Sequence, residues 1–180
     1  MAAITFSRFY KPRPACFDGG TSRFMSRRTE ISAGILAFRR NSGVELLLAH
    51  PGGPYWRGKD EGAWSIPKGV VESGDVLACA KREFNEETGL TADGPLTALT
   101  PLRQKSGKLV HAFALEADFD LSAFSSNSFE MEWPPRSGKL QSFPEVDRIA
   151  YFNLATARRK ILPGQRAFIE ELVRTLDQQT

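Results

Sequence analysis

The sequence predicts a single domain of the α/β (α+β) class, in which a mixed β-sheet packs between helices. The chain has 180 residues, and 41% of them are hydrophobic, which is enough for one substantial core but short for two complete domains. Strand-like and helix-like patterns are interleaved along the chain in unequal numbers. No apolar run approaches the roughly 20 residues that a membrane-spanning helix needs. We therefore expect one compact domain with no membrane partner.

The predicted elements follow from the spacing of apolar residues and from the turn residues between them. Asn41-Ser42-Gly43 joins the first two strands, which predicts a β-hairpin. A loop dense in glycine and charge follows over 51–62. The next helix ends at Gly89, because glycine readily adopts the left-handed conformation that terminates helices. The predicted strands cover 31–40, 44–50, 64–67, 96–104, 109–116, 129–133 and 148–152, and the predicted helices cover 76–88, 154–161 and 164–176.

A basic, irregular N-terminal extension over 1–29 precedes the predicted domain over 30–180. The extension contains Pro12, Pro14 and the pair Gly19-Gly20 and lacks the periodicity of a helix or a strand. Its basic, acid-poor composition resembles a targeting presequence. The alternative is that the natural protein starts at Met25, so that the preceding residues are an upstream misassignment.

The distribution of charge disfavours a nucleic-acid partner. The net charge is +3, but residues 1–30 alone hold six basic and two acidic side chains. The rest of the chain carries eighteen basic and nineteen acidic side chains, so it has no basic surplus with which to follow a phosphate backbone. Cys16 and Cys79 lie in the extension and in a predicted helix, which argues against a disulfide framework and favours a reducing, cytoplasmic location.

Three glutamates in the helix over 76–88 point to metal chemistry. Glu83 lies three residues before Glu86 and four before Glu87, so the three side chains share one side of the helix. Like charges at this spacing destabilise a helix by about a few tenths of a kcal/mol per pair, and Arg82 offsets only one of them. A divalent cation offsets more, and carboxylates without His or Cys favour Mg²⁺ or Mn²⁺ over Zn²⁺.

The structural alternative is that the glutamates are simply a solvated acidic face, which is the commoner role of such a face. Leu77, Ala80 and Phe84 form the predicted apolar stripe on the opposite side of the helix. The preceding segment favours a functional site, because a predicted strand over 64–67 leads into a glycine loop directly before the helix. Backbone groups in such a loop can join a metal or phosphate site.

The segment that contains this helix resembles the Nudix box, whose pattern is G-x5-E-x7-R-E-U-x-E-E-x-G-U, with U an apolar residue. Gly69 matches the opening glycine, and residues 82–90 match the whole closing half. Only twelve residues separate Gly69 from Arg82, one fewer than in the pattern. The first acid of the pattern falls on Asp75 counted forward and on Gly74 counted backward. Asp75 either acts as a shorter acid or caps the helix.

Further similarity to a bacterial Nudix subgroup, described as predicted nucleotide pyrophosphohydrolases, covers residues 50–56, 59–69, 129–138 and 143–148. The resemblance extends over about residues 30–173. It implies the Nudix-type α/β/α sandwich with a mixed β-sheet. It also implies a Mg²⁺-dependent (or Mn²⁺-dependent) hydrolase that cleaves a phosphoanhydride bond in a nucleotide.

The resemblance and the residue chemistry together give the expected site. Glu83, Glu86, Glu87 and the Gly69 carbonyl are expected to hold the metal, with Arg82 orienting the carboxylates. The expected substrate-binding residues are Lys68, Arg57 and Trp56, and the possible extra acids are Asp75, Glu132 and Glu145. Each of these also has a structural explanation as a surface lysine, a solvated acid or a core aromatic side chain.

Dinucleoside polyphosphates and nucleoside triphosphates are the expected substrates, and ADP-ribose and RNA 5′ ends are alternatives that offer the same anhydride. A different class of protein is a Nudix-fold nucleotide-binding or regulatory module that does not hydrolyse its ligand. Such a module could dispense with the three glutamates, and this chain keeps them all. The sequence fixes no oligomeric state.

Overall fold

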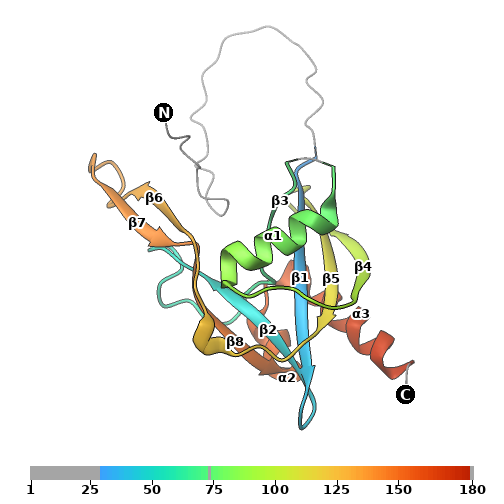
Figure 1. Cartoon of the computed structure of the whole chain (residues 1–180). Helices are drawn as coiled ribbons and strands as arrows, with labels where there is room; N and C mark the ends of the chain where they lie inside the picture. The colour runs from blue at the N-terminus through green and yellow to red at the C-terminus, as the bar shows by residue number, and fades with distance from the viewer. Residues whose placement is uncertain (1–28, 73, 179–180) are drawn as a thin grey trace, which may run out of the picture.

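The structure is a computed structural model of the chain and describes residues 29–72 and 74–178. The expectations for the extension, including the start at Met25, lie outside the described residues except at Thr29. In chain order the elements are β1 (Ile31–Arg40), β2 (Val44–Pro51), β3 (Lys68–Val70), α1 (Val76–Thr88), β4 (Leu96–Arg103), β5 (Leu109–Glu116), the 3₁₀ turn Leu121–Ala123, β6 (Ser128–Glu132), β7 (Leu140–Pro144), β8 (Val146–Asn153), α2 (Leu154–Lys160), the 3₁₀ turn Pro163–Gln165 and α3 (Arg166–Asp177) (Figure 1).

One mixed sheet of six strands is built around β1. The order along the sheet is β4-β5-β1-β2-β8, and β3 pairs with the first part of β1 on the edge that β2 occupies further along. β1 and β5 are parallel, from Ile31↔Leu109 to Phe38↔Glu116, whereas the other pairs in the sheet are antiparallel. β6 and β7 form a separate two-stranded sheet that projects from the body in Figure 1.

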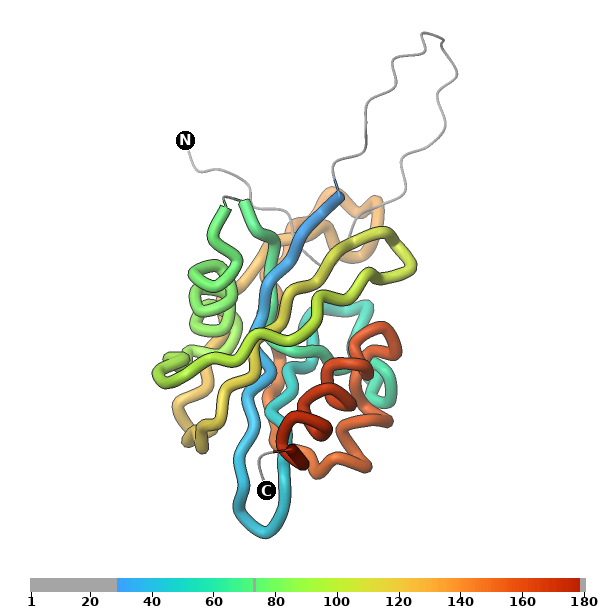
Figure 2. The backbone as a smooth tube through the Cα atoms, turned by 90° about the vertical axis from the view of Figure 1, so that its right-hand side faces the viewer, coloured from blue at the N-terminus to red at the C-terminus, as the bar shows by residue number. Residues whose placement is uncertain are grey.

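Helices cover both faces of the large sheet, because successive side chains of a strand point to opposite faces. Ala33, Ile35 and Ala37 of β1 pack on the α1 side, in a cluster with Phe84. Leu36 packs on the other side, in a cluster with residues of α2 and α3. Figure 2 shows α1 on one side of the sheet and α2 with α3 on the other. The predicted α/β/α sandwich is confirmed.

The helix that carries the glutamates has the predicted bounds. α1 covers Val76–Thr88, and Gly89 ends it in the left-handed conformation at φ 73°. A Cβ atom at Gly89 would lie 2.2 Å from the Ser125 hydroxyl oxygen, so both the backbone and the packing require glycine there. Among the helices of the described ranges, none is long and apolar enough to cross a membrane.

Two strand predictions differ from the structure. The segment over 64–67 is not a strand: it makes the isolated bridges Ala49↔Ser65 and Trp64↔Ile161, and the strand that pairs with β1 follows it as β3. The segment is apolar because it is buried between β2 and the end of α2, not because it belongs to the sheet. β7 is absent from the prediction, since its residues are mostly exposed and show no alternation of apolar and polar side chains.

Candidate active site

The start of α1 is fixed by Asp75. Its carboxylate oxygen Oδ1 accepts hydrogen bonds from the backbone N–H groups of Leu77, at 2.9 Å, and Ala78, at 3.0 Å. These are two of the N–H groups that a helix cannot satisfy internally, so the interaction is an N-cap. Of the two roles considered for Asp75, the structure shows the capping one.

Glu83 and Glu87 lie on the buried stripe of α1. Their exposed fractions are 0% and 1%, respectively, while Glu86 is partly exposed. They follow Ala80 by three and seven residues, which are the spacings of a single helix face. The solvated-face alternative is therefore wrong for Glu83 and Glu87.

The expected stripe opposite the glutamates is also partly wrong. Leu77 is 38% exposed, whereas Ala80 and Phe84 are fully buried on the same side as Glu83 and Glu87. The helix therefore inserts two carboxylates into its contact with the sheet. Because an ionised carboxylate is costly to bury, these two side chains need compensating charges.

Arg82 supplies one compensating charge and contacts two glutamates. Its guanidinium lies 2.7 Å from Glu83 Oε1 and 2.8 Å from Glu86 Oε2. Partial burial acts to lower the pKa of Arg82, but the hydrogen bond to Glu86 and the charge of Glu83 together raise it above its usual value. Arg82 therefore joins the Glu83 and Glu86 carboxylates through one guanidinium.

Lys68 supplies the second compensating charge. Its backbone N–H donates to Glu87 Oε2 at 2.9 Å, and only 7% of the residue is exposed. The interpretation of Lys68 as an ordinary surface lysine is therefore wrong. Burial lowers the pKa of its ammonium, and the charge of Glu87 opposes that shift.

Glu87 has a strongly perturbed carboxyl group. Burial raises its pKa to about 8, against the opposing effect of Lys68, and the charges of Glu83 and Glu145 add to the rise. Glu145 is therefore close enough to act on Glu87, although 58 positions separate them in the sequence. A carboxyl group so affected by burial and like charge is a frequent feature of functional sites.

Backbone hydrogen bonds bring Glu145 to this place. Its N–H donates to the Asn127 carbonyl at 2.7 Å, and the Asn127 N–H donates to the Glu86 carbonyl at 3.0 Å. The Glu145 carbonyl accepts from Gly52 at 2.9 Å. The base of the β6–β7 hairpin is thus joined both to α1 and to the loop that follows β2.

Glu132 lies elsewhere. It is exposed at the distal end of β6, where its carboxylate accepts a hydrogen bond from the Gly138 N–H at 2.7 Å. The structure does not bring it to the α1 glutamates, and its visible role is to close the turn of the hairpin.

The donor set suits a hard divalent cation. Glu83, Glu86 and Glu87 offer carboxylate oxygens, and Gly69 lies beside them on β3, paired with Ala33. Such all-oxygen donors fit Mg²⁺ or Mn²⁺. Within the described part of the chain, no three acidic, histidine or cysteine side chains already converge as metal ligands do, because Arg82 holds Glu83 and Glu86 while Lys68 holds Glu87.

Trp56 and Arg57, expected to bind substrate, lie in the loop after β2. Trp56 is partly buried against the core cluster of α2 and α3, and the Lys59 ammonium lies 4.9 Å from its ring centre. Arg57 is exposed. Tyr55 of the same loop meets Trp133 edge to face, with ring centres 5.2 Å apart. Sequence reasoning did not find this link between loop and hairpin, because no local pattern relates residues so far apart.

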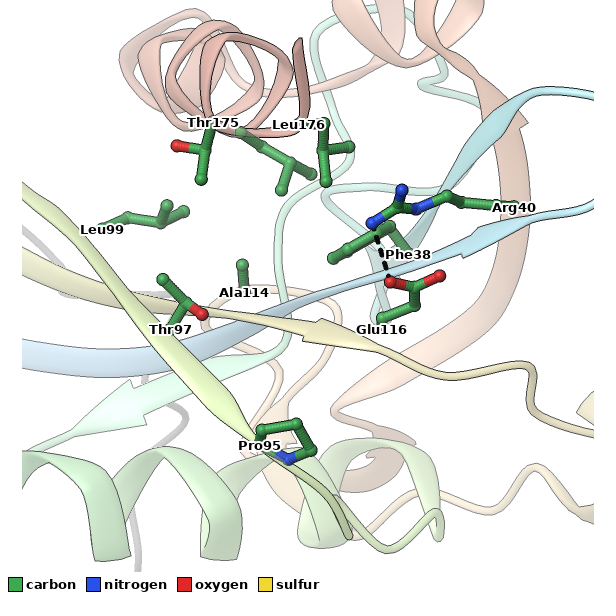
Figure 3. Close-up of a pocket in the computed structure, with 10 residues that line it drawn as sticks. Phe38, Arg40, Pro95, Thr97, Leu99, Ala114, Glu116, Thr175 and Leu176 are labelled. Atoms are coloured by element: carbon green, nitrogen blue, oxygen red, sulfur yellow. Dashed lines mark hydrogen bonds and ion pairs between the residues drawn. The ribbon is translucent and has the colours of Figure 1, made fainter. Parts of the chain in front are cut away.

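Two cavities lie on opposite sides of the sheet. The larger, of about 200 Å³, lies between α3 and the strands on the face away from α1, beside the Arg40–Glu116 ion pair (Figure 3). It is remote from the glutamates and has no place in their chemistry. The second, of about 170 Å³, borders the start of α1 and is lined by Glu72, Asp75, Ala78, Cys79 and Arg82.

The three-layer fold and the acidic helix that follows a glycine-containing strand together define a protein of the Nudix type. The chain belongs to the Nudix family, since the model of the NUDIX domain matches residues 28–172. A segment of 64 residues is 34% identical to Nudix hydrolase 7 of Arabidopsis thaliana, and it covers 35% of this chain and 22% of that protein. The match to the Arabidopsis protein therefore spans about a fifth of that protein's length.

Solved structures of low sequence identity share the fold. An Ap4A hydrolase of C. elegans, in a binary complex, gives a TM-score of 0.56 with 22% identity, covering 82% of this chain and 98% of that one. The NUDIX domain of Shewanella oneidensis NrtR, complexed with ADP ribose, gives a TM-score of 0.58 with 13% identity, covering 83% and 90%.

Proposed function

We propose that this protein is a Mg²⁺- or Mn²⁺-dependent pyrophosphohydrolase that cleaves a phosphoanhydride bond in a nucleotide, with dinucleoside polyphosphates and nucleoside triphosphates as the first candidates. The observation that carries the proposal is the complete burial of Glu83 and Glu87 side by side on α1. A fold gains no stability from two adjacent buried carboxylates, so their retention points to chemistry.

The charges around the site support a cation. When ionised, Glu83, Glu86, Glu87 and Glu145 carry four negative charges, and Lys68 and Arg82 carry two positive ones. The remaining charge of −2 matches one divalent ion. This balance supports Glu83, Glu86 and Glu87, with the Gly69 carbonyl, as the residues that would hold it.

When bound, a divalent ion would supply neutralisation of phosphate charge and a more acidic water. The protein would supply orientation and proton transfer. Arg82 would hold the Glu83 and Glu86 carboxylates in place, and the Lys68 N–H would do so for Glu87. Glu145 is our candidate for accepting a proton from the attacking water, since it lies near Glu87 and comes from a separate element.

The comparisons support the substrate class. The nematode protein is an Ap4A hydrolase and the Shewanella domain was solved with ADP ribose, and both ligands are nucleotides that contain a phosphoanhydride. The near-neutral domain disfavours RNA 5′ ends on a long chain. Arg57, which is exposed, would contact the polyphosphate. A cytoplasmic location stays part of this proposal and rests on the cysteine usage.

The test is product release from a panel of Ap4A, nucleoside triphosphates, ADP-ribose and capped RNA, with and without Mg²⁺ or Mn²⁺. We expect turnover that requires the metal, and a loss of at least about 100-fold in Glu87→Gln, because removal of a charged group from such a centre costs about 3 kcal/mol or more. Glu116→Gln, at the opposite face, is the matched control. Full activity in both Glu86→Gln and Glu87→Gln would refute the assignment. Tight nucleotide binding without turnover would instead favour the regulatory module.

A further inference from the structure

We propose that His50 is a positioning residue that clamps the loop over 52–62, and that it does so as an imidazolium ion paired with Asp147. The effect on substrate binding rests on the function proposed above, whereas the clamp itself does not. His50 lies near the end of β2 and has no exposed surface.

Both nitrogens of the His50 ring face oxygen atoms that can only accept hydrogen bonds. Nδ1 lies 2.7 Å from Asp147 Oδ1, and Nε2 lies 2.9 Å from the backbone carbonyl oxygen of Lys59. A neutral imidazole has one N–H and one lone pair, so it would turn a lone pair toward one of these oxygens. Only the imidazolium donates to both.

Among the charged groups near the His50 ring, Asp147 is the anion that pairs with it. The charged groups around it come from three elements, namely Asp147 and Arg148 of β8, Lys59 and Asp60 of the loop, and Lys160 of α2. Asp60 is already engaged by the Lys160 ammonium, at 2.6 Å, and by the Trp64 indole N–H, at 2.8 Å. Arg148 donates to Asp147 at the longer distance of 3.3 Å.

The hydrogen bond to Lys59 fixes the part of the loop that carries the candidate substrate-binding residues. The Lys59 N–H donates to the Trp56 carbonyl at 2.9 Å, which closes a turn around Arg57. The Lys59 ammonium also lies over the Trp56 ring. His50 therefore acts on Trp56 and Arg57 through the Lys59 backbone, and it contacts no substrate itself.

Loss of one proton would open the clamp on the loop side. The Nδ1 proton faces a carboxylate, and charge-assisted hydrogen bonds are the stronger ones, so the proton leaves from Nε2. The lone pair on Nε2 would then face the Lys59 carbonyl oxygen and the hydrogen bond would be lost. As pH rises, KM for the nucleotide should therefore increase.

The protonation state can be observed directly, because the chain contains only two histidines, His50 and His111. We would record the imidazole ¹⁵N resonances of the labelled full-length protein from pH 5.5 to 9, and assign them with His111→Gln. The expected result is a His50 ring protonated on both nitrogens at low pH that loses the Nε2 proton first. A neutral His50 ring throughout this range, or loss of the Nδ1 proton first, would overturn the proposal.

Kinetics test the link to substrate binding. His50→Phe keeps an aromatic ring against Trp64 but donates no hydrogen bond, and we expect KM to rise about tenfold, the factor that matches one lost buried hydrogen bond, with kcat within about twofold. If His50→Phe does not fold, Asp147→Asn replaces it as the test, at a side chain that is partly exposed. In this variant the increase of KM with pH should begin at a lower pH. His111→Gln is the control for both.

The outcomes separate the two proposals. If the protein hydrolyses nucleotides with metal but KM is unchanged in His50→Phe, the positioning role is overturned and the proposed function stays intact. The same holds if the pH profile of KM is unchanged in Asp147→Asn. An imidazolium at His50 in a protein that hydrolyses none of the nucleotides would overturn the proposed function and leave the clamp intact.

Discussion

Burial and neighbouring charges act together on the carboxyl group of Glu87. Its carboxyl group packs between α1 and β3, and burial raises its pKa to about 8. The folded protein therefore holds this proton more tightly than the unfolded chain does. Between the ordinary pKa of a glutamate and about 8, Glu87 is protonated when folded and ionised when unfolded, so the free energy of unfolding falls as pH rises through this interval.

The first prediction concerns this pH dependence. In metal-free protein, the thermal unfolding midpoint should fall between pH 5 and 8 by an amount that Glu87→Gln largely removes, and the variant should be the more stable protein at pH 8. Burial lowers the pKa of Lys68, so Lys68 makes the free energy of unfolding rise with pH at higher pH, opposite to Glu87. The difference between Glu87→Gln and the parent therefore isolates the contribution of Glu87. Glu116→Gln should leave the slope unchanged, and equal slopes in the parent and Glu87→Gln would contradict the burial argument.

At the same scale, sequence reasoning identified the glutamates but misplaced two of them. The spacing of Glu83, Glu86 and Glu87 correctly predicted a shared side of the helix. It did not reveal that Glu83 and Glu87 lie in the buried stripe with Phe84, because a hydrophobic pattern counts only apolar residues. Burial of a charged side chain depends on compensating groups such as Lys68, which come from other elements.

At the scale of elements, α1 is stabilised at its start by Asp75. We predict that Asp75→Ala lowers the free energy of unfolding by about 1 kcal/mol, whereas Asp75→Ser, which can still accept the hydrogen bonds of the cap, loses much less. Both variants should keep their turnover, since the carboxylate of Asp75 is committed to the backbone. Chemical denaturation and initial rates measure the two effects.

The serine variant separates the two roles of Asp75. Suppose that Asp75→Ser and Asp75→Ala lose activity to the same large extent while the serine variant keeps its stability. This result would show that Asp75 acts as the first acid of the box despite the short loop.

The bounds of elements were predictable where the determining signals are local. α1 was predicted because its cap, its periodicity and its terminal Gly89 lie within one stretch of sequence. β3 and β7 were not, since a strand of three residues is defined by its partner β1, and β7 is defined only by its pairing with β6.

At the scale of the whole molecule, the β6–β7 hairpin and the body meet with little free space. A Cβ atom at Gly52 would lie 2.1 Å from the Pro144 carbonyl oxygen, and Gly52 also donates to Glu145. We predict that Gly52→Ala displaces the base of the hairpin, lowers the free energy of unfolding by about 1 to 3 kcal/mol and reduces kcat, because Glu145 moves from Glu87.

Gly164→Ala is the control for this prediction, since the nearest atom to its Cβ would be at 3.8 Å, an ordinary contact. Unfolding and steady-state kinetics of the two variants are the measurements. Gly52→Ala with the stability and kcat of the parent would show that the hairpin base tolerates the displacement.

Sequence patterns predicted the helix and sheet layers of the molecule. They did not predict which residues far apart in the sequence lie close together in space. The sandwich follows from apolar periodicity and from the Nudix resemblance. The approach of Glu145 to Glu87, and of Tyr55 to Trp133, is created by the path of the chain around β2 and the hairpin, and no local pattern encodes it. Glu145 could be identified as a candidate acid, but it could not be distinguished from Glu132 until the fold placed the two at opposite ends of the hairpin.

The parallel pairing of β1 with β5 also affects how the chain is made. Ile31 pairs with Leu109, so the ribosome must add 78 residues before a strand can pair with the edge of β1 that lies away from β2 and β3. At about 5 to 20 residues per second, this interval lasts about 4 to 16 s. During it, the β1–β2 hairpin presents an apolar edge with unpaired backbone groups, the kind of template on which nascent chains aggregate. Translation speed over residues 41–109 should therefore affect the yield of folded protein more than speed over α2 and α3.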